Sequence, residues 1–145
     1  MANSPAVLKG YLEFSGALAG GALSAATRER IALLVAEENG CDYCLSAHTY
    51  IGTNIAGLDR DETERNRHAE SADPKAAAVL ALAAALLRTR GGVADADLKA
   101  AHEAGLTDGE ITEVVAGVAL NVFTNYLNKA ADTDIDWPVV RHHRH

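Results

Sequence analysis

The longest regular pattern in the chain is helical, and it begins at Thr107. Thr107 and Glu110 have the spacing of a capping box, in which each side chain accepts a hydrogen bond from the other residue's backbone N–H. Apolar residues then recur every three or four positions, as they do on one face of a helix: Ile111, Val114, Val118 and Val122. We therefore expect a helix from Thr107 to about Lys129–Ala130, and a chain that folds by packing helices.

Similar start and stop signals divide the rest of the chain. Asn39-Gly40 is typical of a left-handed helix cap, and Asp73-Pro74 is typical of a helix start. The predicted helices cover residues 6–18, 24–39, 42–56, 75–90 and a short stretch from Asp95 or Asp97 to Gly105. The charged segment 60–70 predicts a short solvated helix or loop.

Composition supports this all-α interpretation. Hydrophobic residues make up 48% of the chain and aromatic residues only 5%, so the core must be built from Ala, Leu, Val and Ile. A length of 145 residues suits one domain, residues 1–145, with its core at about 24–130. The 75–90 helix is apolar on all sides, which predicts full burial and a nearby subunit interface in a homo-oligomer.

Charge and hydropathy exclude several classes of protein. A net charge of −7 argues against nucleic-acid binding, which needs a basic face. The longest apolar run, 76–87, is too short to span a membrane, and residues 1–5 lack the pattern of a secretion signal. We expect a cytoplasmic protein, where a close cysteine pair is more often catalytic or redox-active than structural.

Both cysteines lie in the stretch 40–48, as Cys41 and Cys44 at C-x-x-C spacing. The predicted helix that begins at Asp42 places them in its first turn, where free N–H groups and the helix dipole favour a thiolate. His48 follows Cys44 by four residues and shares its helix face, so the imidazole can accept the thiol proton. The stretch therefore contains a nucleophile, a resolving thiol and a base.

The cysteine motif does not meet the requirements of three other kinds of cysteine site. Structural zinc needs four ligands, and this motif offers three. A c-type haem site is excluded because Leu45, not His, follows Cys44, and the βαβ surroundings of a thioredoxin fold are absent. Two inert, buried cysteines remain an alternative.

The motif resembles the alkylhydroperoxidase D (AhpD-like) group of the carboxymuconolactone decarboxylase superfamily. The resemblance rests on a Glu twelve residues before the first Cys, then C-x-x-C, then a His four residues after the second Cys, matched by Glu29, Cys41, Cys44 and His48. It is strong over residues 24–58 and looser elsewhere, including Asn125 and the segment 134–138. Tyr43 stands where the best-known members have a second His, so a two-histidine relay is not carried over.

The resemblance implies an AhpD-like bundle and a peroxidase that reduces alkyl hydroperoxides through a dithiol–disulfide cycle. Cys44 is then the peroxidatic residue, Cys41 the resolving residue, His48 the base and Glu29 a proton relay. It implies no cofactor and no metal, an external dithiol reductant such as a dihydrolipoyl group on a partner protein, and a trimer or hexamer. The alternatives are a lactone enzyme of the decarboxylase branch, against which the dithiol counts, and a non-catalytic redox sensor.

Helical geometry also selects Glu29 among the acids that precede the motif. Glu29 lines up with Leu33 and Ala36 on an apolar face, where a carboxylate needs a partner, whereas Glu37 lines up with Arg30 on what we expect to be a solvated stripe. An early-turn acid that only favours the helix N-terminus is the alternative.

The remaining histidines carry weaker signals. His68, among Arg and Glu, is expected to be solvated, and His102 to be packed or solvent-facing. The tail 141–145, with sequence Arg-His-His-Arg-His, can bind metal loosely, but a short basic terminus is usually disordered.

Overall fold

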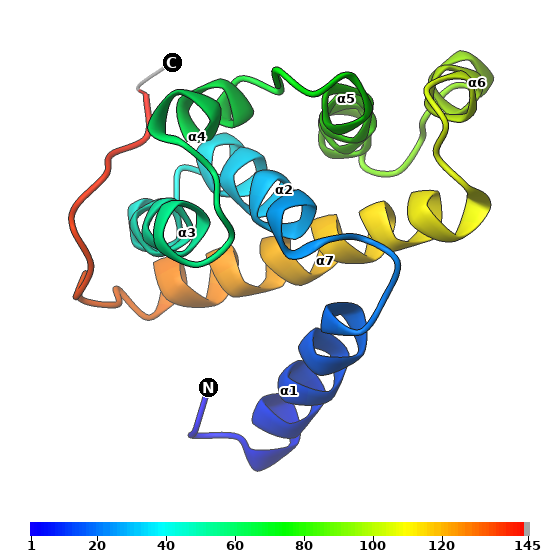
Figure 1. The fold of residues 1–145 in the computed structure, drawn as a ribbon. Helices are drawn as coiled ribbons and strands as arrows, with labels where there is room; N and C mark the ends of the chain where they lie inside the picture. Colours follow the sequence, from blue (N-terminus) through cyan, green and yellow to red (C-terminus); the bar gives the residue numbers. More distant parts are fainter. Residues whose placement is uncertain (144–145) are drawn as a thin grey trace.

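The structure, a computed structural model, describes residues 1–143, and Figure 1 shows the helices that they form. These are α1 (Pro5–Ala19), α2 (Ala25–Glu38), α3 (Asp42–Asn54), α4 (Arg60–Arg67), α5 (Pro74–Thr89), α6 (Asp95–Glu103) and α7 (Asp108–Ala130). Residues 1–143 contain no strand, so the predicted all-α bundle is confirmed. None of these helices is long and apolar enough to cross a membrane.

Helix α2 is the centre of the bundle. It packs against α3, α4, α5 and α7, and Figure 1 shows it between α3 and α5 with α7 crossing beneath. Every residue from Ile31 to Glu37 is buried. A buried polar side chain without a hydrogen-bond partner is energetically costly. The polar residues of this buried segment therefore need partners on the neighbouring helices.

The predicted helix ends are confirmed where the capping chemistry is strongest. Thr107 and Glu110 form the capping box, with Thr107 N donating to Glu110 Oε2 at 2.8 Å and Glu110 N donating to Thr107 Oγ1 at 3.2 Å. Gly40 has a φ of 58°, and Cys41 N donates back to Ala36 O at 2.9 Å. This left-handed cap ends α2 and turns the chain directly into α3.

The apolar helix α5 finds most of its cover within one chain. Seven of its residues are buried against α2, α6 and α7, and they are Ala76, Val79, Leu80, Leu82, Ala83, Ala85 and Leu86. The burial predicted for this helix is therefore largely provided without a second subunit. Exposed apolar side chains lie instead on α1 and α7, among them Leu12, Phe14, Phe123 and Tyr126. A homo-oligomer remains a prediction.

Helix α4 corrects two expectations. The segment 60–70 is not simply solvated, because Arg67 is buried along with Glu62, Thr63 and Asn66. Glu37 does not lie on a solvated stripe either: it is 3% exposed, and its Oε2 accepts a hydrogen bond from Arg67 Nε at 2.8 Å. A helical wheel of α2 alone cannot show that α4 covers this face.

The C-terminal tail corrects a third expectation. Residues 141–143 are docked rather than disordered, whereas 144 and 145 lie outside the described residues. The backbone N–H of His143 donates to Glu37 Oε1 at 2.7 Å, and Arg67 Nη2 donates to Arg141 O at 2.8 Å. Figure 1 shows the tail leaving α7 and running around α3 toward α4. Burial raises the pKa of Glu37, but the hydrogen bonds from His143 and Arg67 outweigh it and lower the pKa.

The tail also binds the start of α3. Arg141 Nη1 donates to Asp42 Oδ2 at 2.8 Å, and the backbone N–H of His142 donates to Asp42 Oδ1 at 2.9 Å. The His142 ring lies 2.7 Å from the same oxygen. Burial raises the pKa of Asp42, but these hydrogen bonds and the His142 charge lower it to about 2.

We predict that Arg67→Ala lowers the free energy of unfolding by ~3 kcal/mol, because it removes the cationic partner of the buried Glu37 carboxylate. Arg65→Ala is the matched control: its side chain is 42% exposed and pairs with Glu62 at 3.5 Å, so a change of at most ~0.5 kcal/mol is expected. Urea denaturation of the oxidised proteins at one protein concentration measures both values. Similar losses in the two variants would contradict a special role for the buried pair.

We also predict an acid-dependent contribution from Asp42. A carboxylate with a lower pKa in the folded state stabilises the fold above its unfolded pKa, near 4, and loses this contribution as the pH falls to about 2. At a pH near 6, Asp42→Asn should lower the free energy of unfolding by ~2 kcal/mol. Between about pH 4 and about pH 2, the variant should lose less stability than the wild type, because it lacks this carboxylate. Asp134→Asn, at an exposed position, should leave the curve unchanged. Urea denaturation across this pH range measures the free energy of unfolding. If Asp42→Asn shows the same pH dependence as the wild type, the prediction is wrong.

Candidate redox site

The two cysteines lie at the N-terminus of α3 and are joined by a disulfide. Cys41 is the N-cap residue, and its Sγ lies 3.3 Å from the backbone N–H of Cys44. Both are buried, at 1% and 3% exposure, and pack with Leu33, Ala36, Leu45 and Leu58. The sulfur atoms therefore lie in the first helical turn, where the free N–H groups and the helix dipole stabilise negative charge.

His48 lies one turn after Cys44 in α3 and contacts Glu29 of α2. His48 Nδ1 is 2.8 Å from Glu29 Oε2, and both side chains are mostly buried, at 23% and 17% exposure. A carboxylate at Nδ1 orients the ring and leaves Nε2 as the second site for a proton. The structure thus brings the predicted base and the predicted relay together, while their roles remain predictions.

A cavity of about 270 Å³ opens beside this His–Glu pair. It lies between α1, α2 and α7, and its lining includes His48, Glu29, Leu23, Ile31 and Leu120. Neither cysteine is part of the lining. The cavity lining is mixed, since Arg28, Glu113, Asn121 and Thr124 also contribute to it, and the His–Glu pair lies between this cavity and the rest of the cysteine helix.

Two polar contacts at the site were not anticipated from the sequence. Asn128 of α7 donates from Nδ2 to Cys44 Sγ at 3.4 Å. Ser46 Oγ accepts from Val140 N at 2.9 Å and so fixes the tail beside α3. One sequence pattern could have indicated a role for Asn128. Three amide side chains recur at helical spacing on a mainly apolar helix, at Asn121, Asn125 and Asn128.

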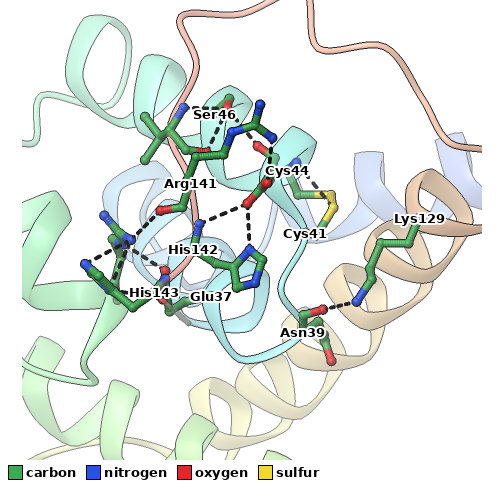
Figure 2. Close-up of polar contacts among 12 residues, drawn as sticks. Glu37, Asn39, Cys41, Cys44, Ser46, Lys129, Arg141, His142 and His143 are labelled. Atoms are coloured by element: carbon green, nitrogen blue, oxygen red, sulfur yellow. Dashed lines mark hydrogen bonds and ion pairs between the residues drawn. A yellow bond between two sulfur atoms is a disulfide. The ribbon is translucent and has the colours of Figure 1, made fainter. Parts of the chain in front are cut away.

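Figure 2 shows how the tail and the cysteine turn come together. Arg141 and His142 reach toward the start of α3 next to Cys41, and Lys129 donates to the carbonyl of Asn39 just before the turn. Asn125, fully buried, accepts a hydrogen bond from Asn39 Nδ2 at 3.0 Å. The segment that carries the disulfide is thus held by hydrogen bonds from the tail and from α7.

The other predicted positions are more peripheral. Tyr43 is partly buried and packs against the cluster that contains both cysteines. His102 has a 49% exposed side chain and pairs with Asp108, as expected of a solvent-facing residue. His68 is also 49% exposed, but it stacks on His143 with ring centroids 5.1 Å apart.

Comparison with solved structures shows where this fold occurs. An uncharacterized peroxidase-related protein from Ralstonia eutropha JMP134, described as an alkylhydroperoxidase AhpD core, is 24% identical with a TM-score of 0.80, over 89% of this chain and 70% of that one. An uncharacterized peroxidase-related protein from Silicibacter sp. TM1040 is 23% identical with a TM-score of 0.77, over 92% and 70%.

A third solved structure matches nearly the whole of both chains. It is a protein of unknown function from Agrobacterium tumefaciens, described as a candidate antioxidant defence protein AhpD, and it is 17% identical with a TM-score of 0.82 over 96% and 95%. Identities this low support the fold alone. The predicted AhpD-like bundle is confirmed.

Sequence comparison shows the family. No curated protein sequence matches the chain. The model of the carboxymuconolactone decarboxylase family matches residues 5–86, which include α2, the cysteine pair, His48 and Glu29. This match covers more than half of the chain, and the AhpD-like fold with its cysteine pair fits a redox role. The chain therefore belongs to the carboxymuconolactone decarboxylase family.

Proposed function

We propose that the protein is a thiol-dependent peroxidase that reduces alkyl hydroperoxides. The observation that carries the proposal is the cysteine pair at the start of α3. One turn later, His48 has its Nδ1 within hydrogen-bond distance of the mostly buried Glu29 carboxylate. A dithiol that can alternate with a local disulfide needs only a proton acceptor to become a nucleophile.

In the first step, His48 accepts the Cys44 proton, and the thiolate attacks the terminal oxygen of the hydroperoxide. The O–O bond breaks, the sulfur is oxidised by two electrons to a sulfenic acid, and the leaving alkoxide takes the proton from His48 to give an alcohol. Glu29, through its contact with His48 Nδ1, keeps the ring oriented for both proton transfers. Glu29 is thus a positioning residue.

In the second step, the Cys41 thiol attacks the Cys44 sulfenic acid, an S–S bond forms and water leaves. The product is the disulfide seen between Cys41 and Cys44. An external dithiol then returns two electrons by thiol–disulfide exchange. The resemblance to AhpD-like proteins suggests a dihydrolipoyl group on a partner protein as this dithiol.

Thiol counting tests the cycle. Prereduced wild-type protein treated with cumene hydroperoxide should lose both of its free thiols. Cys44→Ser should abolish the reaction, and Cys41→Ser should stop at a sulfenic acid that dimedone traps. Retained turnover in both single variants would exclude the mechanism. Reversible disulfide formation without peroxide turnover would favour the redox sensor instead.

The role of Glu29 is tested by the pH dependence of Cys44 alkylation. In a Cys41→Ser background only one thiol remains, so the alkylation rate reports the Cys44 thiolate directly. We predict that Glu29→Gln raises the thiol pKa and slows peroxide reduction, because His48 loses the carboxylate at Nδ1.

Glu38→Gln is the matched control, since Glu38 is on the same helix and exposed. Glu37 does not serve, because its substitution would break the buried pair with Arg67. Circular dichroism checks that both variants retain helix content. An unchanged alkylation profile in folded Glu29→Gln would refute the positioning role.

A further inference from the structure

The docked tail brings one of its histidines to a Glu–His pair on α4. Glu64 lies in the last turn of α4, and His68, four residues later, is the C-cap residue of this helix, so both side chains lie on one side of the helix end. Glu64 Oε1 is 3.5 Å from His68 Nε2 and 3.5 Å from His143 Nε2. The three residues offer ligand atoms that all lie within 4.8 Å of one another.

These separations fit a small divalent transition-metal ion. Donor atoms around tetrahedral zinc, with bonds of about 2.0 to 2.2 Å, lie roughly 3.3 to 3.6 Å apart. Two imidazole nitrogens and one carboxylate oxygen are also donors that zinc accepts. Slight inward rotation of exposed side chains would complete three coordination positions and leave the fourth for water or a further ligand.

Polar groups already contact two of the three candidate ligands from behind. Arg67 Nη1 donates to the other carboxylate oxygen, Glu64 Oε2, at 2.6 Å, so Oε1 remains for an ion. His143 Nδ1 lies 3.2 Å from the buried Glu37 Oε1, which can orient this ring and leave Nε2 to face Glu64 Oε1. Carboxylates behind the ligating histidine are a usual feature of metal sites.

Local charge is also compatible with a cation. Arg67 Nη2 lies 3.2 Å from His143 Nδ1 and 3.5 Å from its Nε2, and it brings one positive charge to the cluster. Glu37 and Glu64, both paired with Arg67, bring two negative charges. With neutral imidazoles the cluster therefore has a net charge of −1 before an ion binds.

We propose that Glu64, His68 and His143 form a binding site for Zn²⁺ or a similar first-row divalent ion, which fastens the C-terminal tail to α4. The site is separate from the cysteine pair and does not depend on the peroxidase proposal. Because the ion holds residue 143 in its docked position, its binding stabilises the folded chain by mass action.

The test is a titration of the full, oxidised chain with Zn²⁺ by calorimetry near neutral pH. The disulfide removes the two thiols as competing ligands. One saturable ion per chain is expected in the wild type, with affinity lowered at least ~10-fold in His68→Ala and in His143→Ala. His102→Ala is the matched control, since its side chain is equally exposed at 49%, and it should bind as the wild type does.

Thermal unfolding gives a second readout. Added zinc should raise the melting temperature of the wild type and of His102→Ala, and should not raise that of His68→Ala. Absence of saturable binding, or wild-type affinity in His68→Ala or His143→Ala, would overturn the proposal.

Discussion

The rest of the structure depends on the burial of α2. This helix packs on four others and yet carries carboxylates on two of its faces, at Glu29 and Glu37. A buried carboxylate without a partner is costly, so each must be met by a cationic or hydrogen-bonding group from another element. Glu29 is met by His48 of α3, and Glu37 by Arg67 of α4 and the backbone of the tail.

This single requirement links the bundle core to the site. The same helix that supplies Leu33 and Ala36 to the packing around the cysteines also supplies the acid that orients His48. Its C-terminal cap at Gly40 then fixes where α3 begins, and hence where both sulfur atoms lie relative to the helix dipole. Geometry at the cysteine pair is therefore a property of α2 as much as of α3.

Local chemistry made the helices and part of the site predictable. Thr107 with Glu110, Asp73 with Pro74, and Asn39 with Gly40 specify their own backbone through short-range hydrogen bonds, and each appears as expected. Glu29 lies on a helix face with Leu33 and Ala36, and this apolar setting predicts a carboxylate that needs a partner. Cys41, Cys44 and His48 were recognisable because one helix turn sets their spacing.

Long-range contacts explain what was missed. Glu37 lies in line with Arg30 on a helical wheel, but Arg30 pairs with Glu62, and Glu37 pairs with Arg67, thirty residues away. The spacing of residues along α2 does not indicate which of its faces α4 will cover. The docking of the tail is not predictable from its own sequence for the same reason. It depends on carboxylates far away in the sequence, Glu37 and Asp42, which accept hydrogen bonds from residues 141–143.

The long sequence separation of the tail contacts has a consequence during synthesis of the chain. Asp42 is bound by His142, which lies 100 positions later, and Cys44 is contacted by Asn128, which lies 84 positions later. The cysteine helix is therefore made long before either of these neighbours exists. While the chain grows, disulfide formation depends on the redox state of the compartment and on the C-x-x-C spacing itself, and the surroundings of the finished fold take no part in it.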